Sequence, residues 1–243
     1  MHTGTLRSLP DNPIQRLHIG RPANCATCPS EQRIAGPNCY YLPVHVHLQA
    51  SRLTIRRFTA EDEDNLVSLN SDPEVMRYLT GGVPEPGRDQ IRDEIIPFHL
   101  AFYEAHPGFG TWAADDIGTG SFLGWFHLRP RRSDGLPDLG YRLRRSAWGN
   151  GYATEGSRAL IDKGFADHDI DRVVAETMTV NLASRRVMEK CGMGYVRTYF
   201  EDERYAIEGA EQGHVEYQLT RADWEAARQL TALARCGPGA ARR

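Results

Sequence analysis

The sequence predicts one domain of the α+β (mixed α/β) class between residues 51 and 228, and three observations support this class. Short stretches with an apolar residue at every second position, typical of strands, alternate there with longer stretches of helical period. Several strand-like stretches follow one another across short, turn-rich connections, which is typical of antiparallel pairing. With 40% hydrophobic residues among 243, the chain has enough apolar side chains to bury a core.

The first predicted elements are a strand and a helical region. Residues 53–58 alternate between apolar and polar side chains, as in a half-buried strand. Thr59 follows, with Asp62 three positions later, a spacing typical of a capping box at the start of a helix. The helical period continues to residue 79 and is interrupted at Pro73.

The remaining elements follow from changes in the apolar period. They are a helix over 88–104, strands over 110–114, 122–128 and 139–143, a helix over 151–166, a strand over 172–179, a helix over 182–191, and strands over 195–200 and 214–219. Pro97 lies inside the first of these helices, so we expect a kink or a break there.

Both ends of the chain depart from this pattern. Residues 1–50 contain six prolines and no sustained apolar period, so we predict a poorly ordered extension that ends near Ser51. Residues 229–243 are predicted to form a flexible tail. The folded domain is therefore expected over residues 51–228.

Three of the five cysteines lie in the N-terminal extension. Cys25 and Cys28 form a C-x2-C pair, and Cys39 is followed by His45 and His47; together these are the residue types of a tetrahedral zinc site. Such sites usually contain two well-spaced pairs, whereas the second half here is a lone cysteine and a His-x-His. We therefore predict no metal-binding residues in this chain. Whether these cysteines nevertheless bind a metal ion is left open by the sequence.

Charge and hydropathy exclude several classes of protein. The formal net charge is −3, so no overall positive field exists to hold nucleic acid or an anionic membrane. No stretch approaches the roughly 18 apolar residues of a membrane-spanning helix, and the N-terminus has no signal-peptide pattern. The odd number of cysteines favours a reducing compartment. We expect a cytoplasmic protein that binds neither nucleic acid nor membrane.

A glycine-rich turn is the most informative motif. The strand that ends at Leu143 leads into Gly149, Asn150 and Gly151, and a helix follows. Glycines let the backbone approach a ligand closely, and the first N–H groups of a helix are unpaired and lie at the positive end of its dipole. The turn therefore predicts a pyrophosphate cradle, although a tight turn without a ligand has the same letters. It is no dinucleotide fingerprint, because the third glycine would fall at Thr154.

A second motif follows the next strand. Asn181 is predicted to cap a helix, Ser184 lies one turn inside it, and Gly192 ends it. Taken alone, Asn181 is simply a cap and Ser184 an exposed hydroxyl.

The two motifs together resemble a known family. Residues 144–155 resemble the acetyl-CoA pyrophosphate motif of the GNAT superfamily of N-acetyltransferases, and residues 181–193 resemble its following motif, especially in the RimJ/RimL-like branch. Residues 139–143 and 217–224 are also similar to that branch. One departure is Ser146, where the superfamily usually has Gln or Arg. The resemblance covers about 52–225 and implies a GNAT-like fold: a mostly antiparallel twisted sheet of six to seven strands with a V-shaped splay and helices on both faces.

The resemblance also implies a reaction and its site. Acetyl-CoA would lie in the splay as co-substrate, and a primary amine, either a small molecule or a protein N-terminal α-amine, would attack it directly. Backbone groups would hold the pantetheine arm and the pyrophosphate, Ser184 would donate to the departing thiolate, and Asn181 would orient the cofactor arm or a water. The implied cofactor-binding residues are Arg142, Leu143, Arg144, Gly149, Asn150, Gly151, Tyr152, Ala153, Thr154 and Asn181.

The attacking amine needs a base, because an amine with a pKa near 8–10 is mostly protonated at pH 7. The candidates are His127, Glu176, Glu201 and Glu203. The resemblance slightly favours Glu201 or Glu203, which follow the strand that ends near Tyr199.

Two questions stay open in the sequence. The chain is either an enzyme of this class or a non-catalytic acyl-CoA-binding module with a regulatory or interaction role. A homodimer is possible through an exposed sheet edge near the C-terminal strands. The acceptor amine itself is not determined.

Overall fold

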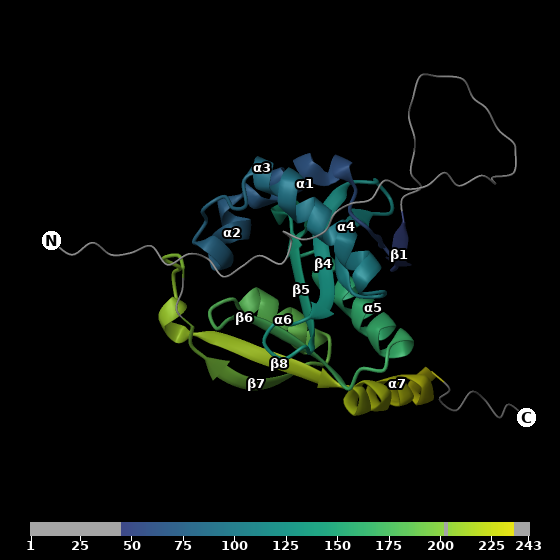
Figure 1. Cartoon of the computed structure of the whole chain (residues 1–243). Coiled ribbons are helices and arrows are strands. Elements are labelled where there is room, and N and C mark those ends of the chain that lie inside the picture. Colours follow the sequence, from purple (N-terminus) through teal and green to yellow (C-terminus); the bar gives the residue numbers. More distant parts are fainter. Residues whose placement is uncertain (1–44, 202–203, 236–243) are drawn as a thin grey trace, which may run out of the picture. The chain divides into compact units, whose positions relative to one another are not determined.

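The structure is a computed structural model that describes residues 45–201 and 204–235 (Figure 1). The described residues build one sheet with helices packed against it. Four residues that the sequence analysis singled out lie outside the described ranges: Cys25, Cys28, Cys39 and Glu203.

The sheet contains eight strands in the order β1-β2-β3-β4-β5-β6-β8-β7. Their bounds are β1 (Val46–Gln49), β2 (Leu53–Arg56), β3 (Gly110–Asp116), β4 (Phe122–Pro130), β5 (Pro137–Leu143), β6 (Arg172–Met178), β7 (Gly194–Tyr199) and β8 (His214–Thr220). All neighbouring strands pair in the antiparallel sense except β5 and β6, which are parallel.

The additional strand is β1, which lies inside the range predicted to be a poorly ordered extension. It pairs with β2, with Gln49 opposite Thr54. The sequence prediction missed it because only four residues take part and neither face of the strand is fully buried, so no apolar period develops. The sheet therefore begins before residue 51, which corrects the predicted boundary.

The sheet opens between β5 and β6. These strands are in register only at Asp138 opposite Val174, whereas β4 pairs with β5 along the whole length of β5. Beyond Asp138 the two strands diverge, and Figure 1 shows β4 and β5 running away from β6, β8 and β7. This divergence is the predicted V-shaped splay, and it leaves one edge of β5 unpaired.

The helices are α1 (Glu63–Asn70), α2 (Pro73–Thr80), α3 (Arg88–Gln90), α4 (Ile96–Ala105), α5 (Tyr152–Asp167), α6 (Leu182–Lys190) and α7 (Arg221–Arg235). The helical region after Thr59 begins as predicted, because the Thr59 N–H donates to Asp62 Oδ2 at 2.9 Å. Pro73 starts α2, and the expected break near Pro97 is a π-helical turn over Ile91–Ile95 immediately before α4.

Two apolar clusters cover the two faces of the sheet. One joins Phe126 and Leu143 to α5, and the other joins Phe122 to α1 and α4. Because side chains alternate along a strand, Leu139 and Leu143 of β5 face α5, whereas Gly140 and Arg142 face α1. The functional residues of β5 can therefore be assigned to one face or the other.

The C-terminal helix α7 continues to Arg235, past the predicted start of the flexible tail at residue 229. None of the described helices is long and apolar enough to cross a membrane.

Candidate active site

The glycine-rich turn forms an open cradle at the start of α5. Gly149 and Gly151 have φ angles of 73° and 82°, the left-handed region that favours glycine. A Cβ at Gly149 would meet nothing within 4 Å, so the space above the turn is free for a ligand. Gly151 caps α5 without any side-chain hydrogen bond, which leaves the first N–H groups of the helix to a ligand. These features fit the predicted pyrophosphate cradle.

Arg52 supports this cradle from the turn between β1 and β2. Its backbone N–H donates to Glu155 Oε1 at 2.6 Å, and its Nε donates to Glu155 Oε2 at 2.8 Å. Its Nη1 also donates to the carbonyl oxygen of Asn150 at 3.0 Å. The guanidinium therefore neutralises the carboxylate in the first turn of α5, beside the place where phosphate would bind. Sequence analysis missed Arg52, because nothing local links it to a turn about a hundred residues away.

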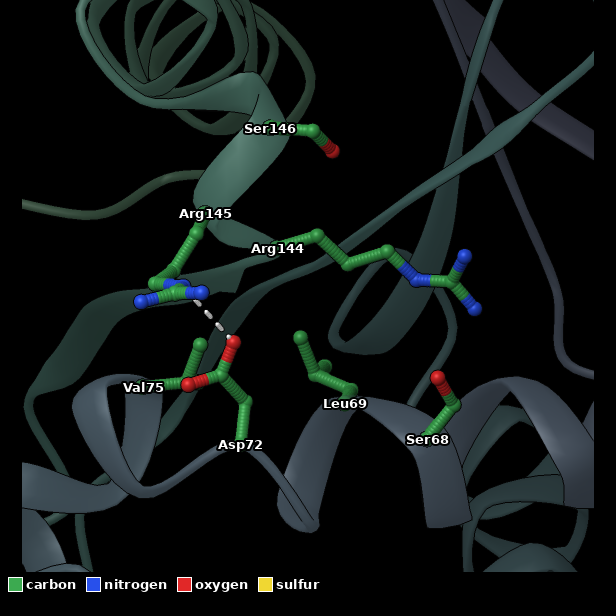
Figure 2. A pocket seen from close by; sticks show the side chains of 7 residues that line it. All are labelled: Ser68, Leu69, Asp72, Val75, Arg144, Arg145 and Ser146. Atoms are coloured by element: carbon green, nitrogen blue, oxygen red, sulfur yellow. Dashed lines mark ion pairs between the residues drawn. The ribbon is translucent and has the colours of Figure 1, made fainter.

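A small cavity lies between the end of β5 and helices α1 and α2 (Figure 2). Its volume is about 260 Å³, and it is lined by Ser68, Leu69, Asp72, Val75, Arg144, Arg145 and Ser146. Arg145 Nε lies 3.0 Å from Asp72 Oδ2, so this arginine has a counterion. Figure 2 shows the Arg144 guanidinium pointing away from Arg145, towards the side of the cavity where Ser68 lies.

The unpaired edge of β5 corrects one detail of the predicted cofactor contacts. The Arg144 N–H donates to the carbonyl oxygen of Leu123 at 2.8 Å, so it is engaged with β4. Backbone groups alternate between the two edges of a strand, so Arg142 also points towards β4, whereas Tyr141 and Leu143 point into the gap. Of the three predicted edge positions, Leu143 alone points into the gap. Its carbonyl oxygen accepts from Trp148 Nε1 at 2.8 Å, so its N–H is the group left for a ligand.

Asn181 and Ser184 lie in the cap and first turn of α6, as their spacing predicted, and Ser184 contacts β5 across the gap. Asn181 caps α6, since its Oδ1 accepts from the Ser184 N–H at 3.2 Å, and its Nδ2 donates to Thr177 Oγ1 at 3.1 Å. The Ser184 hydroxyl oxygen accepts from the Tyr141 hydroxyl at 3.3 Å, which joins α6 to β5. Burial raises the pKa of Tyr141 to about 12, so this phenol stays protonated. Tyr141 lies within residues 139–143, and its contact with Ser184 was not predicted from the sequence.

His127 lies on the other face of the sheet, the face covered by α1. It is buried, and its Nε2 is 3.0 Å from Asp138 Oδ2. Burial lowers the pKa of His127, so the ring is neutral at neutral pH. The ring lies over Gly140, where a Cβ would come within 2.5 Å of it.

The two candidate carboxylates in the described residues differ in their surroundings. Glu176 is bound by Arg131 Nη1, which also donates to Glu216 Oε2 at 3.0 Å. Glu201 is exposed beyond the end of β7. Burial, a hydrogen bond to Glu176 and the charges of Glu176 and Glu201 raise the pKa of Tyr199. In the ranges that the structure covers, no group of three His, Cys, Asp or Glu residues is arranged to hold a metal ion.

The splayed sheet, the glycine cradle at its end and the hydroxyl pair across the gap fit the fold of an acyl-CoA-dependent acetyltransferase. The acetyltransferase (GNAT) domain family matches residues 52–194, which is more than half of the chain. This chain therefore belongs to the GNAT acetyltransferase family.

Individual relatives agree with this assignment. The chain is 34% identical over 188 residues to the FsC-acetyl coenzyme A-N(2)-transacetylase of Aspergillus fumigatus, covering 73% of this chain and 77% of that protein. The crystal structure of RimL, a ribosomal alpha-N-protein acetyltransferase in complex with coenzyme A, has a TM-score of 0.60 at 14% identity and covers 72% of this chain and 98% of that one. A spermidine N-acetyltransferase from Vibrio cholerae in complex with CoA and spermine has a TM-score of 0.57 at 16% identity, with 72% and 99% covered.

The comparisons confirm the predicted fold class, reaction class and co-substrate: the protein is an acetyl-CoA-dependent N-acetyltransferase. The two structural matches show the fold alone because their sequence identities are low. The substrates in their names belong to those proteins.

Proposed function

We propose that the chain acetylates a primary amine, either a small molecule or a protein N-terminal α-amine, by direct attack, as in the RimJ/RimL-like branch. The observation that carries this proposal is the arrangement along β5. The open glycine cradle lies beyond one end of the strand, and Tyr141 contacts Ser184 across the gap beside it. When bound, acetyl-CoA supplies the acetyl group as an activated thioester.

The backbone of this chain would hold the co-substrate. The N–H groups from Gly149 to Thr154 would bind the pyrophosphate, with the dipole of α5 adding attraction. On the open edge of β5, the Tyr141 backbone and the Leu143 N–H would pair with the pantetheine amides in the manner of an added strand. A backbone N–H on this edge would also stabilise the negative charge that develops on the thioester carbonyl oxygen.

Ser184 would protonate or hydrogen-bond the departing thiolate. Because the Ser184 oxygen already accepts from Tyr141, its own proton is free to point towards the sulfur. Tyr141 remains protonated and would strengthen this donation through the chain of hydrogen bonds. Asn181 would act as a positioning residue, since it fixes the first turn of α6 on which Ser184 lies.

The base that accepts the proton of the attacking ammonium is proposed to be Glu201 or Glu203. Support comes from the place of Glu201 beside Tyr199, at the end of the strand that follows the Ser184 helix. A specific observation favours His127 as the second candidate, because its neutral ring can accept a proton and Asp138 would stabilise the resulting charge. Separate Glu201→Gln, Glu203→Gln and His127→Gln variants would decide this. Only loss of the true base removes the acidic limb from the pH profile of kcat/KM.

Acetyl-CoA binding gives the first test of the proposed function. At 100 times its dissociation constant a ligand adds about 2.7 kcal/mol to the free energy of unfolding, which corresponds to a rise in Tm of about 5–11 °C for a domain of this size. ATP and NAD serve as controls. Release of CoA thiol with a panel of amines then distinguishes an enzyme from a non-catalytic acyl-CoA-binding module, which would show the Tm rise and release no thiol.

We also propose a homodimer formed along β7. This strand is the last in the sheet order, and Tyr195 and Val196 on it are exposed. Sedimentation of the wild type and of Val196→Lys would test this. The wild type should sediment as a dimer and the variant as a monomer, and a monomeric wild type would contradict the proposal.

A further inference from the structure

Arg142 in β5 and Arg144 just beyond its end lack the counterions that two other partly buried arginines have. Arg56 pairs with Asp62 and Asp115 at 2.7 and 2.6 Å, and Arg131 pairs with Glu216 at 3.0 Å. Arg142 and Arg144 form no ion pair within the described residues. A guanidinium taken out of water without a carboxylate is costly, so such an arrangement needs a reason.

The partners of these two arginines are neutral amides of α1. Arg142 Nη1 donates to Asn70 Oδ1 at 2.5 Å, and Arg144 Nη2 donates to Asn65 Oδ1 at 3.2 Å. The Nε atoms of both arginines are buried and have no hydrogen-bond partner. Each asparagine can orient a guanidinium, but it cannot neutralise the positive charge.

The two guanidinium groups lie on one face of the sheet. Arg142 and Arg144 are two residues apart, so their side chains leave β5 in the same direction, towards α1. Arg142 lies 5.1 Å from the ring centroid of Trp125, and Arg144 lies 5.2 Å from that of Phe122. Each guanidinium is thus held by one aromatic ring of β4 and one asparagine of α1.

Arg142 stays charged, and Arg144 lines a cavity that a ligand can enter. Burial lowers the pKa of Arg142 to about 10, which still leaves the group charged at neutral pH. Arg144 lines the cavity of about 260 Å³ between α1 and the end of β5, beside the hydroxyl-bearing residues Ser68 and Ser146 (Figure 2). An anion that entered here would meet the Arg144 guanidinium, and the Arg142 guanidinium lies on the same face of the sheet, held by the same helix α1.

We propose that Arg142 and Arg144 form an anion-binding site for the acceptor, and that the acceptor is therefore an amine that also carries a carboxylate. This inference rests on the proposed acetylation of an amine, and it specifies the substrate class of that same site. The carboxylate accepts hydrogen bonds from the guanidiniums, and the amine of the same molecule is thereby oriented towards the acetyl group in the splay.

The position of the pair favours the acceptor over the phosphates of the co-substrate. The cradle expected to bind pyrophosphate lies at the start of α5, and α5 packs on the opposite face of the sheet from α1. Arg142 precedes Gly149 by seven residues, along the strand expected to hold the pantetheine arm, which places it towards the acetyl end. A phosphate contact remains one outcome of the test, because phosphate and carboxylate share the chemistry of the site.

Matched acceptors test the inference in the wild-type protein. L-Ornithine and putrescine carry the same amines on the same carbon chain, and only L-ornithine has a carboxylate. We expect kcat/KM to be about 10- to 100-fold higher for L-ornithine, because charged hydrogen bonds to a guanidinium are worth that factor. Equal values, or a preference for putrescine, would overturn the proposal. Turnover of either amine would still support the proposed function.

Variants assign the selectivity to the arginines. Arg142→Met and Arg144→Met should each lower the ratio of kcat/KM for L-ornithine to kcat/KM for putrescine about tenfold or more, and Arg142→Lys should restore part of this ratio. Arg92→Met, which removes an exposed arginine paired with Asp93, is the matched control and should change neither acceptor. If the Arg142 and Arg144 variants instead weaken acetyl-CoA but not acetyl-pantetheine, which lacks the phosphates, the site binds cofactor phosphate and the proposal is wrong.

A binding measurement separates this inference from the proposed function. N-acetyl-L-ornithine and N-acetylputrescine are titrated into the protein with CoA, and neither titration depends on turnover. Selective binding of the carboxylate compound, lost in Arg142→Met, supports the site even if no amine is acetylated. Equal affinities for the two compounds would contradict the proposed anion site, even if the enzyme acetylates amines.

Discussion

At the scale of single residues, contacts within one helix were predicted from the sequence, and contacts between elements were not. Ser184 and Asn181 were predicted as neighbours because an asparagine cap and a first-turn residue are three positions apart on any helix. Tyr141 was not predicted to join them, because its contact with Ser184 depends on how β5 and α6 meet across the splay. Arg142 and Arg144 were predicted as backbone contacts, and their side-chain partners on α1 could not be read from the sequence.

Removal of the Ser184 hydroxyl should slow the chemical step. We expect Ser184→Ala to lower kcat about 10- to 100-fold, or roughly 1.4–2.7 kcal/mol, because the thiolate loses its donor. The dissociation constant of acetyl-CoA should not change. Thiol release and equilibrium binding, measured on the same preparation, check both statements. An equal loss of binding and rate would show that Ser184 is structural.

Acid should destabilise the fold through a partly buried histidine, His99. Burial lowers the pKa of His99 to about 4 from its ordinary 6.5, so below pH 6.5 the unfolded chain binds a proton that the folded chain refuses. This contribution to stability is complete above pH 6.5 and is lost as the pH falls towards 4, by about 3 kcal/mol in all.

The measurement is urea unfolding between pH 7 and pH 4.5 for the wild type and His99→Gln. The variant should lose less stability over this range. His106→Gln, which changes an exposed histidine next to the same helix, should follow the wild type. A His99→Gln curve parallel to the wild-type curve would rule out this source of acid sensitivity.

At the scale of elements, local signals were read correctly and distant ones were missed. The turn into α5 and the start and end of α6 follow from glycines and a cap within a few residues of each other, so the sequence contains them. The strand β1 gains its pairing only from β2, and Arg52 gains its role only from a helix about a hundred residues later. No local period or cap marks either of them.

The cradle can be tested by comparing two glycines that have the same left-handed backbone conformation. Gly149 and Gly120 both have left-handed φ angles, 73° and 69°, and a Cβ at either would meet nothing within 4 Å. Alanine should therefore cost each position a similar free energy of unfolding, about 1 kcal/mol. Only Gly149→Ala should weaken acetyl-CoA binding, by about tenfold or more, because its methyl group would fill the cradle. Equal acetyl-CoA affinities in the two variants would place the ligand elsewhere.

At the scale of the whole molecule, the boundary of the folded unit lies earlier in the chain than residue 51. We expect a deletion of residues 1–44 to leave the Tm and acetyl-CoA binding unchanged, because β1 is retained. A deletion of residues 1–50 removes β1 from its pairing with β2, and it should lower the Tm by several degrees. Thermal unfolding of the two truncations side by side checks this. An equal loss in both would show that residues 1–44 themselves stabilise the domain.

The single register pair between β5 and β6 has a further consequence. It divides the sheet into two antiparallel halves, β1 to β5 and β6 to β8, which share very little backbone hydrogen bonding. A co-substrate lying in the splay would act as a missing ninth strand that fastens one half to the other. We therefore expect hydrogen exchange to be slowed by acetyl-CoA in both halves at once, including amides of β6 and β8 that never touch the ligand. While it is bound, the co-substrate would therefore also stabilise the fold by joining the two halves of the sheet.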